Sequence, residues 1–290
     1  MNGRHGLLLL GFVFTLPPIV QAQAGAATME TSRGIALGTG VRASAVSSAA
    51  LLYNAASMPL ARSYHIEGTG TYEPQAGRIG VMAAATDSML NEHFAAGLAV
   101  RGIFSDGEQG YSGFDGRLGL AVPIADVVGI GLAGRYVSLS NEAVPAGMSD
   151  TAPNGFTMDA SLRVTLAERI HIAGLVYNFI DLHSPLAPVT VGGSASFQLM
   201  DSFTAGADVL FDTSTYDSAK AQVGGGIEYL ASGAIPIRAG YFYDAGLNVH
   251  AVSGGLGYVS RLIGIDFAIR QQVTGDKDTY LITTLRYFVY

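Results

Sequence analysis

Strict alternation of apolar and polar residues is the feature of this chain that most limits its possible folds. From Phe156 to Leu166 every even-numbered residue is apolar and every odd-numbered residue is polar. Similar patterns recur over residues 189–199, 203–211 and 263–270. A strand sends successive side chains to opposite faces, whereas a helix cannot gather such a set on one face. The sequence therefore predicts strands with one apolar face and one polar face.

About fourteen such segments follow one another, separated by turn signals. We expect strands to begin near Tyr64, Arg78, His93, Tyr111, Val127, Gly155, Arg169, Pro188, Ser202, Lys220, Ile235, His250, Leu262 and Thr279. Short turns are expected around residues 125–126, 167–168, 200–201, 232–233 and 260–261, and longer polar loops around 105–109, 141–153, 181–187, 213–217 and 274–278. This asymmetry and the even strand number are typical of a transmembrane antiparallel β-barrel of the bacterial outer membrane. Both ends of such a barrel lie on its short-turn, periplasmic side.

Composition agrees with strands that face lipid. The mean hydropathy is +0.33 and only 13% of the residues are charged. Beyond the N-terminus no apolar run reaches the roughly 18 residues of a transmembrane helix. Alternating strands explain how the chain can be hydrophobic without a long apolar run, because every second side chain can face lipid. A soluble β-sandwich is the alternative, and the uniformly apolar faces argue against it. The net charge of −7 provides no basic surface for nucleic acid.

The first 24 residues have the pattern of a secretory signal peptide. Arg4 and His5 precede an apolar stretch from Leu7 to Val20, and Ala24 ends a small-x-small motif. We expect cleavage near Ala24 and export to the outer membrane. A membrane anchor is the alternative, but the stretch is shorter than the roughly 20 residues that a bilayer core needs.

Residues 25–63 lack the alternation and precede the barrel, which we place at residues 64–290. Residues 43–60 are rich in small side chains and could form one or two helical turns that Pro59 would end. About 35 residues of mildly apolar chain would fit inside a barrel of this width, so we predict an N-terminal plug, or hatch. The alternative is a tail that lies against the periplasmic rim.

Charged residues occur on the polar faces of the strands in balanced numbers. The acids are Glu67, Asp115, Asp159, Asp208, Glu228 and Asp266, and the bases are Arg101, Arg117, Arg135, Arg163, Arg238 and Arg270. Opposite charges on neighbouring strands can pair across the wall. One interpretation is a ladder that braces the barrel, and the other is a set of ligands or substrate guides. A ring of one sign would instead have indicated an ion-selective pore.

Small residues also follow the polar face, among them Gly129, Gly131 and Gly224. They leave room for a segment threaded inside or for close backbone contact. One strand departs from the pattern of polar or small residues on the inner face. In residues 169–180 the alternation places Leu175, Tyr177 and Phe179 in the lumen and turns Asn178 to lipid.

The last strand, residues 279–290, ends in an aromatic residue, as bacterial barrels commonly do. We expect the barrel assembly machinery to bind this strand. The sequence does not decide which face of this strand points to lipid, because Ile282 and Phe288 share one face while Leu285 and Tyr287 share the other.

Residues 41–60, with Ala-Leu-Leu-Tyr-Asn-Ala-Ala-Ser-Met at positions 50–58, resemble the N-terminal hatch of the FadL-type long-chain fatty acid transporters and their PorV-like relatives. The Asn-Pro-Ala triplet of that family corresponds to Asn54-Ala55-Ala56, without the proline. Residues 235–241 and 250–258 are also similar. The resemblance implies a hatch-plugged barrel of fourteen strands that passes hydrophobic molecules from outside without an energy source. No cofactor is expected. The resemblance gives the hatch residues Ser47, Leu51, Leu52, Tyr53, Asn54, Ala55, Ala56 and Met58 as the candidate gate.

Two functions remain open. The first is passive uptake of hydrophobic small molecules such as long-chain fatty acids, although the brief outer loops indicate a reduced capture site. The second is a non-transporting barrel that acts as a structural or secretion partner, surrounded like the first by outer-membrane lipid. An enzyme is not expected, since the sequence has no Gly-x-Ser-x-Gly motif and no pair of histidines at metal-ligand spacing.

Overall fold

The computed structural model describes residues 29–105, 110–124, 127–140, 152–275 and 277–289. The predicted signal peptide, the turn at 125–126, most of the loops at 105–109 and 141–153, and Tyr290 lie outside the described residues. In the described ranges, no helix has both the length and the apolar character needed to cross a membrane.

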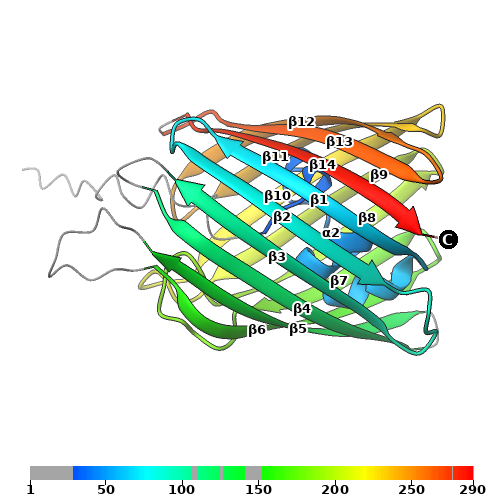
Figure 1. Ribbon diagram of the computed structural model, residues 1–290, viewed down its shortest axis with the longest axis horizontal. Coiled ribbons are helices and arrows are strands. Elements are labelled where there is room, and N and C mark those ends of the chain that lie inside the picture. Colours follow the sequence, from blue (N-terminus) through cyan, green and yellow to red (C-terminus); the bar gives the residue numbers. More distant parts are fainter. Residues whose placement is uncertain (1–28, 106–109, 125–126, 141–151, 276, 290) are drawn as a thin grey trace, which may run out of the picture.

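Fourteen strands form one closed antiparallel barrel, in which every strand pairs with its neighbours in sequence and β1 pairs with β14 (Figure 1). Every strand begins within two residues of its predicted start. The barrel prediction is therefore confirmed. The strands are β1 Tyr64–Glu73, β2 Arg78–Asp87, β3 Ala95–Ser105, β4 Ser112–Ile124, β5 Val128–Ser140, β6 Asn154–Leu166, β7 Ile170–Tyr177, β8 Thr190–Met200, β9 Phe203–Asp212, β10 Lys220–Ala231, β11 Ile235–Asp244, β12 Val249–Val259, β13 Ile263–Gln272 and β14 Thr279–Val289.

The outer face of the wall is apolar. In β6, Phe156 and Leu162 are about half exposed, whereas Thr157 and Asp159 on the other face are buried. Exposed tyrosines lie toward both ends of the strands, including Tyr72 and Tyr241 at one end and Tyr229, Tyr258 and Tyr287 at the other. Two aromatic girdles around an apolar band are the surface that a bilayer and its two interfaces require.

The two rims of the barrel differ in their connections. We call the rim where β1 begins and β14 ends the terminal rim, and the opposite rim the loop rim. Tight turns at the terminal rim use left-handed backbone, as at Ala167 and Glu168 (φ 50° and 60°) and at Ser232 and Gly233 (φ 52° and 69°). The predicted asymmetry has exceptions, because the connection 88–94 at the terminal rim is longer than the connection 74–77 at the loop rim.

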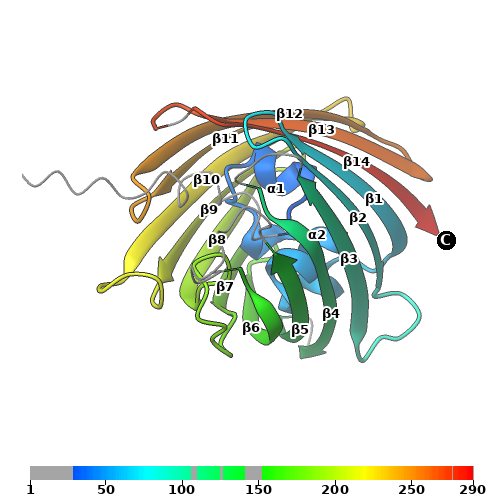
Figure 2. The same cartoon turned by 60° about the vertical axis from the view of Figure 1, so that its left-hand side comes forward.

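The described residues that precede β1, residues 29–63, lie inside the barrel (Figures 1 and 2). This N-terminal segment, residues 29–63, contains α1 Ser32–Ala36, the 3-10 helix η2 Arg42–Ser44, α2 Ser47–Tyr53 and the 3-10 helix η3 Ala55–Leu60. The Thr31 hydroxyl begins α1 by accepting a hydrogen bond from the Gly34 amide. Helices α1 and η2 contact strands β7 to β14, whereas α2 and η3 contact strands β1 to β6.

Glycines of the wall make room for this segment. A Cβ atom on Gly131 would overlap the backbone of Ala55 and Ala56, and one on Gly240 would overlap the backbone of Leu37. A side chain at either position would push the segment off the wall, so the inward glycines allow its backbone to approach closely.

The facing predicted for residues 178 and 179 is wrong. Strand β7 ends at Tyr177, and Asn178 adopts a left-handed conformation with φ of 51°. That conformation breaks the two-residue period of the strand, so Asn178 is buried and Phe179 is 43% exposed. Leu175 faces inward as predicted. In β14, whose facing was open, Ile282 is buried in the lumen and Leu285 is exposed.

Candidate functional site

The candidate site is the lumen, and all twelve predicted lumen charges lie on the inner face of the wall. Glu228 of β10, Arg238 of β11 and Asp266 of β13 form one chain of ion pairs, which reaches Glu67 of β1 through Arg286 of β14. Arg238 lies 2.5 Å from both Glu228 and Asp266, and Arg286 links Asp266 to Glu67. Sequence reasoning missed Arg286, because the facing of the last strand could not be decided from its pattern.

A second group of charges lies on the opposite part of the wall. Asp115 sits between Arg135, at 2.7 Å, and Arg101, at 3.3 Å. Arg117 pairs with Asp159 at 3.0 Å. These groups match the interpretation of the charges as a ladder that braces the wall, since neighbouring strands supply opposite signs.

Arg163 differs from the other predicted charges. Among the described residues no carboxylate lies within ion-pair distance of its guanidinium, which instead donates to the Thr165 hydroxyl. Thr165 in turn lies 3.1 Å from His171.

The N-terminal segment has charges of its own that reach the wall. Arg33 of α1 lies 3.1 Å from Glu228, Arg42 of η2 lies 2.6 Å from Asp208, and Glu30 lies 3.4 Å from Arg270. Sequence reasoning missed these three residues. A signal was present, because Glu30, Arg33, Arg42 and Arg62 are the charged residues of an otherwise uncharged stretch.

The predicted hatch residues lie along α2 and η3. Leu51, Leu52, Tyr53, Asn54, Ala55, Ala56 and Met58 are at most 5% exposed, and Ser47 at the start of α2 is partly buried. Leu51 and Met58 pack over Gly119 of β4. The wall also binds the backbone of the segment, because Arg117 donates to the Leu52 carbonyl and the Ser161 hydroxyl accepts from the Ala56 amide at 3.0 Å.

Tyr53, Tyr177 and Arg42 form a cluster at the centre of the lumen. The Arg42 guanidinium lies 5.5 Å from the centre of the Tyr53 ring and 5.7 Å from that of Tyr177. Burial lowers the pKa of Arg42, but the Tyr177 phenol and the Asp208 carboxylate outweigh burial and raise the net pKa. Burial raises the pKa of the Tyr53 phenol. The cluster therefore keeps a cation near two aromatic rings.

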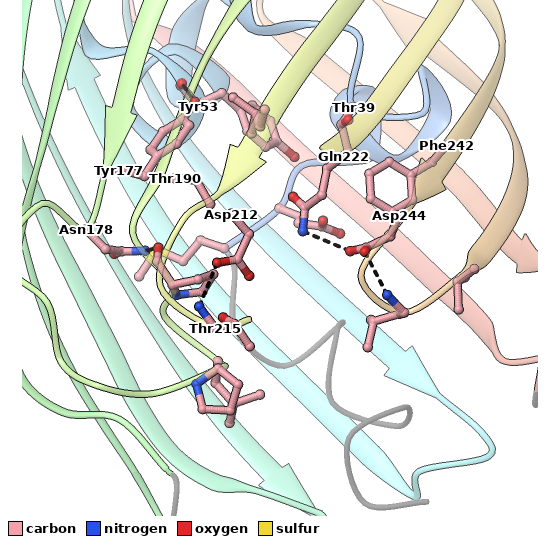
Figure 3. A pocket seen from close by; sticks show the side chains of 18 of the residues that line it. Thr39, Tyr53, Tyr177, Asn178, Thr190, Asp212, Thr215, Gln222, Phe242 and Asp244 are labelled. Atoms are coloured by element: carbon pink, nitrogen blue, oxygen red, sulfur yellow. Dashed lines mark hydrogen bonds between the residues drawn. The ribbon is translucent and has the colours of Figure 1, made fainter. Parts of the chain in front are cut away.

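A cavity of about 170 Å³ lies between this cluster and the loop rim. Its floor comes from the N-terminal segment through Met29, Leu52 and Tyr53. Its walls combine apolar side chains of strands and loops with polar ones that are at least as numerous, and Figure 3 shows part of both. The apolar set includes Pro185, Leu186, Pro188, Leu210, Phe242, Leu247 and Val249.

Two acids of this cavity, Asp212 and Asp244, accept hydrogen bonds from the loops, and the third, Glu30, pairs with Arg270. The Asp212 carboxylate accepts from the amides of Ser214 and Thr215, and the Asp244 carboxylate accepts from the amide of Leu247 (Figure 3). Gln222 donates to Asp244 at 2.9 Å. These bonds fix the ends of β9 and β11, where the loops begin.

A buried pair of Ser48 and His65 joins α2 to β1. The Ser48 hydroxyl lies 3.1 Å from His65 Nε2, and both side chains are fully buried. A substrate cannot reach a hydroxyl so enclosed, so the pair ties the segment to the wall. Within the described part of the chain, no group of three or more potential metal ligands occurs.

No family model matches the chain, and no curated protein matches its sequence. Among solved structures, the Ralstonia pickettii toluene transporter TbuX is similar with a TM-score of 0.59 and 13% identity, over 91% of this chain and 99% of that chain. A Rhodopseudomonas blastica porin variant reaches a TM-score of 0.45 at 10% identity, over 78% of this chain and 99% of that chain. At such low identity the likeness to TbuX shows the fold alone. The chain has the fold of an outer-membrane β-barrel.

Proposed function

We propose that this protein is an outer-membrane barrel for passive uptake of hydrophobic small molecules, and that its N-terminal segment acts as the hatch. The candidate solutes are aromatic hydrocarbons and long-chain fatty acids. TbuX, which shares the fold, is described as a toluene transporter, and the sequence resembles the fatty acid transporters at residues 41–60. Export by the signal peptide and recognition of β14 by the assembly machinery belong to the same proposal.

The observation that carries the proposal is the cavity at the loop rim. Leu186, Leu210 and Val249 give it apolar walls, so a hydrophobic solute can leave water there. Its floor is the N-terminal segment, with the cluster of Tyr53, Tyr177 and Arg42 at the centre. A solute therefore binds above the hatch and crosses only when the hatch moves.

A reversible crosslink tests the gate, because the native chain has no cysteine. The Ala56 amide and the Ser161 hydroxyl are 3.0 Å apart, so an Ala56→Cys and Ser161→Cys pair can join η3 to β6. We expect protein-dependent uptake of radiolabelled toluene and oleate into proteoliposomes, measured above the direct partition into protein-free liposomes, to stop when the pair is oxidised and to return on reduction.

A matched crosslink within the wall is the control. Thr69 of β1 and Thr284 of β14 are register partners with hydroxyls 3.1 Å apart. Because the Thr284 hydroxyl also lies 2.7 Å from the Ser32 hydroxyl of α1, the control compares the two redox states of one variant, and the Thr69→Cys and Thr284→Cys pair should give equal uptake when oxidised and when reduced. Equal uptake by the oxidised and reduced hatch pair would contradict gating by the segment, and no uptake by the native protein would contradict transport.

The packing of the segment favours a second function, that of a non-transporting partner barrel. Leu51 and Met58 are each 1% exposed, so the lumen is filled at the level of α2 and η3. A partner protein would then bind a rim. Stoichiometric co-purification of one protein from native membranes, together with absent uptake in proteoliposomes, would support this function over the first.

A further inference from the structure

A second, much smaller cavity lies next to the Tyr53 and Tyr177 rings. Its volume is about 10 Å³, and it is lined by Asn54, Arg117, Asp159 and Ser161 among others. It shares Tyr53, Arg117 and Tyr177 with the large cavity. It therefore lies at the junction of the N-terminal segment with strands β4 and β6.

Three buried polar atoms without a hydrogen-bond partner belong to residues that line this cavity. They are Oδ1 of Asn54, Nε of Arg117 and Oδ2 of Asp159. Their side chains belong to residues that are 2%, 7% and 6% exposed. Nearly all buried polar groups in proteins are hydrogen-bonded, so three unbonded atoms of residues that line one cavity point to a partner inside it.

The other polar atoms of these side chains are already bonded. Asn54 Nδ2 donates to the Arg42 carbonyl and to the Ser57 hydroxyl, which fixes the orientation of the amide. Arg117 donates through Nη1 to the Leu52 carbonyl, and Asp159 Oδ1 accepts from the Asn178 amide. Asp159 Oδ2 also lies 3.0 Å from Arg117 Nη2 in their ion pair, but without hydrogen-bond geometry, so one donor and two acceptors still lack a hydrogen bond.

We propose that one ordered water molecule occupies this cavity and bridges the three atoms. Water can donate to Asn54 Oδ1 and Asp159 Oδ2 and accept from Arg117 Nε–H, which uses every remaining group. The cavity is near the minimum size that holds a single water, and three polar partners are the usual number for a buried one.

The charges at the site favour water over a cation. Arg117 and Asp159 form an ion pair with a 3.0 Å contact, so together they are neutral. An added cation would be a buried charge without a counterion, and it would face the Nε–H donor of Arg117. The water thus joins three elements, namely the start of η3, β4 and β6.

A crystal structure of the full chain that resolves ordered water tests the proposal. We expect one peak within about 3.2 Å of each of the three atoms. An empty cavity, or a direct hydrogen bond between Asn54 Oδ1 and Arg117 Nε, would overturn it. Soaking the crystals in rubidium chloride identifies a cation, because an anomalous peak at the site would likewise overturn the assignment.

Two variants separate the acceptor from the rest of the Asn54 side chain. In Asn54→Leu the water should be lost, since the side chain fills the space without an acceptor. In Ser57→Ala, which removes only a partner of Asn54 Nδ2, the water should remain. A water retained in Asn54→Leu or lost in Ser57→Ala would contradict the assigned partners. If a variant does not fold, crystals of the native protein with and without rubidium still show whether the cavity holds water, a cation or nothing.

Discussion

The two parts of the lumen hold the N-terminal segment in different ways. Helices α1 and η2 are fastened to the wall by ion pairs, through Arg33 and Glu228 and through Arg42 and Asp208. Helices α2 and η3 are fastened mainly by apolar burial, through Leu51, Leu52 and Met58. Ion pairs fix the orientation and position of the segment, but each buried charge depends on its partner to offset the cost of leaving water. Apolar packing imposes little restriction on contact geometry, but it is sensitive to the volume of each side chain.

The largest effect is expected where one ion-pair partner is removed. Asp208→Ala leaves the buried Arg42 guanidinium without its carboxylate, so the free energy of unfolding should fall by about 3–5 kcal/mol. Urea titration of the barrel in detergent, followed by circular dichroism, measures it. A loss below about 1 kcal/mol would show that the charges do not hold this half.

Truncation in the apolar half should cost somewhat less. Leu51 is 1% exposed and packs over Gly97 and Gly119. Leu51→Ala should lower the free energy of unfolding by about 3 kcal/mol, through lost burial and the cavity that remains. The same urea titration reports it, and Leu51→Met, which conserves volume, should cost less than about 1.5 kcal/mol. Equal losses in both variants would contradict the role of packing.

The close backbone approach of the segment can be tested with added methyl groups. Gly131→Ala places a Cβ against the backbone of Ala55 and Ala56, so a loss of about 1–3 kcal/mol is expected. Gly68 has nothing within 4 Å of its added Cβ, so Gly68→Ala is the matched control. Similar results for the two variants would mean that the inward glycines do not seat the segment.

The smallest effect is expected at the exposed pair of Arg169 and Asp201. These side chains are 54% and 92% exposed and lie 3.0 Å apart. Arg169→Ala should change the free energy of unfolding by less than about 1 kcal/mol, because water and salt screen the charges. A change as large as that of Asp208→Ala would remove the distinction between buried and exposed pairs.

The sequence predicted the strands because alternation is a local property of the chain. The residues beside Thr157 and Asp159 in the sequence suffice to predict that these two side chains point into the lumen, as they do. The charged residues of the wall were predicted from the same alternation. Where the backbone leaves the β region, the pattern misleads. Because Asn178 has a left-handed backbone conformation, its side chain is buried and that of Phe179 is exposed, the reverse of the prediction.

By itself, then, the sequence determined the strand positions, the lipid-facing surface and the presence of balanced charges inside. Only the tertiary structure decided which charges meet, since Arg42 and Asp208 are 166 residues apart. It also decided where the N-terminal segment lies, because its small side chains are compatible with several surfaces. The physical reason is that facing depends on a two-residue period, whereas pairing depends on closure of the barrel and the register of all its strands.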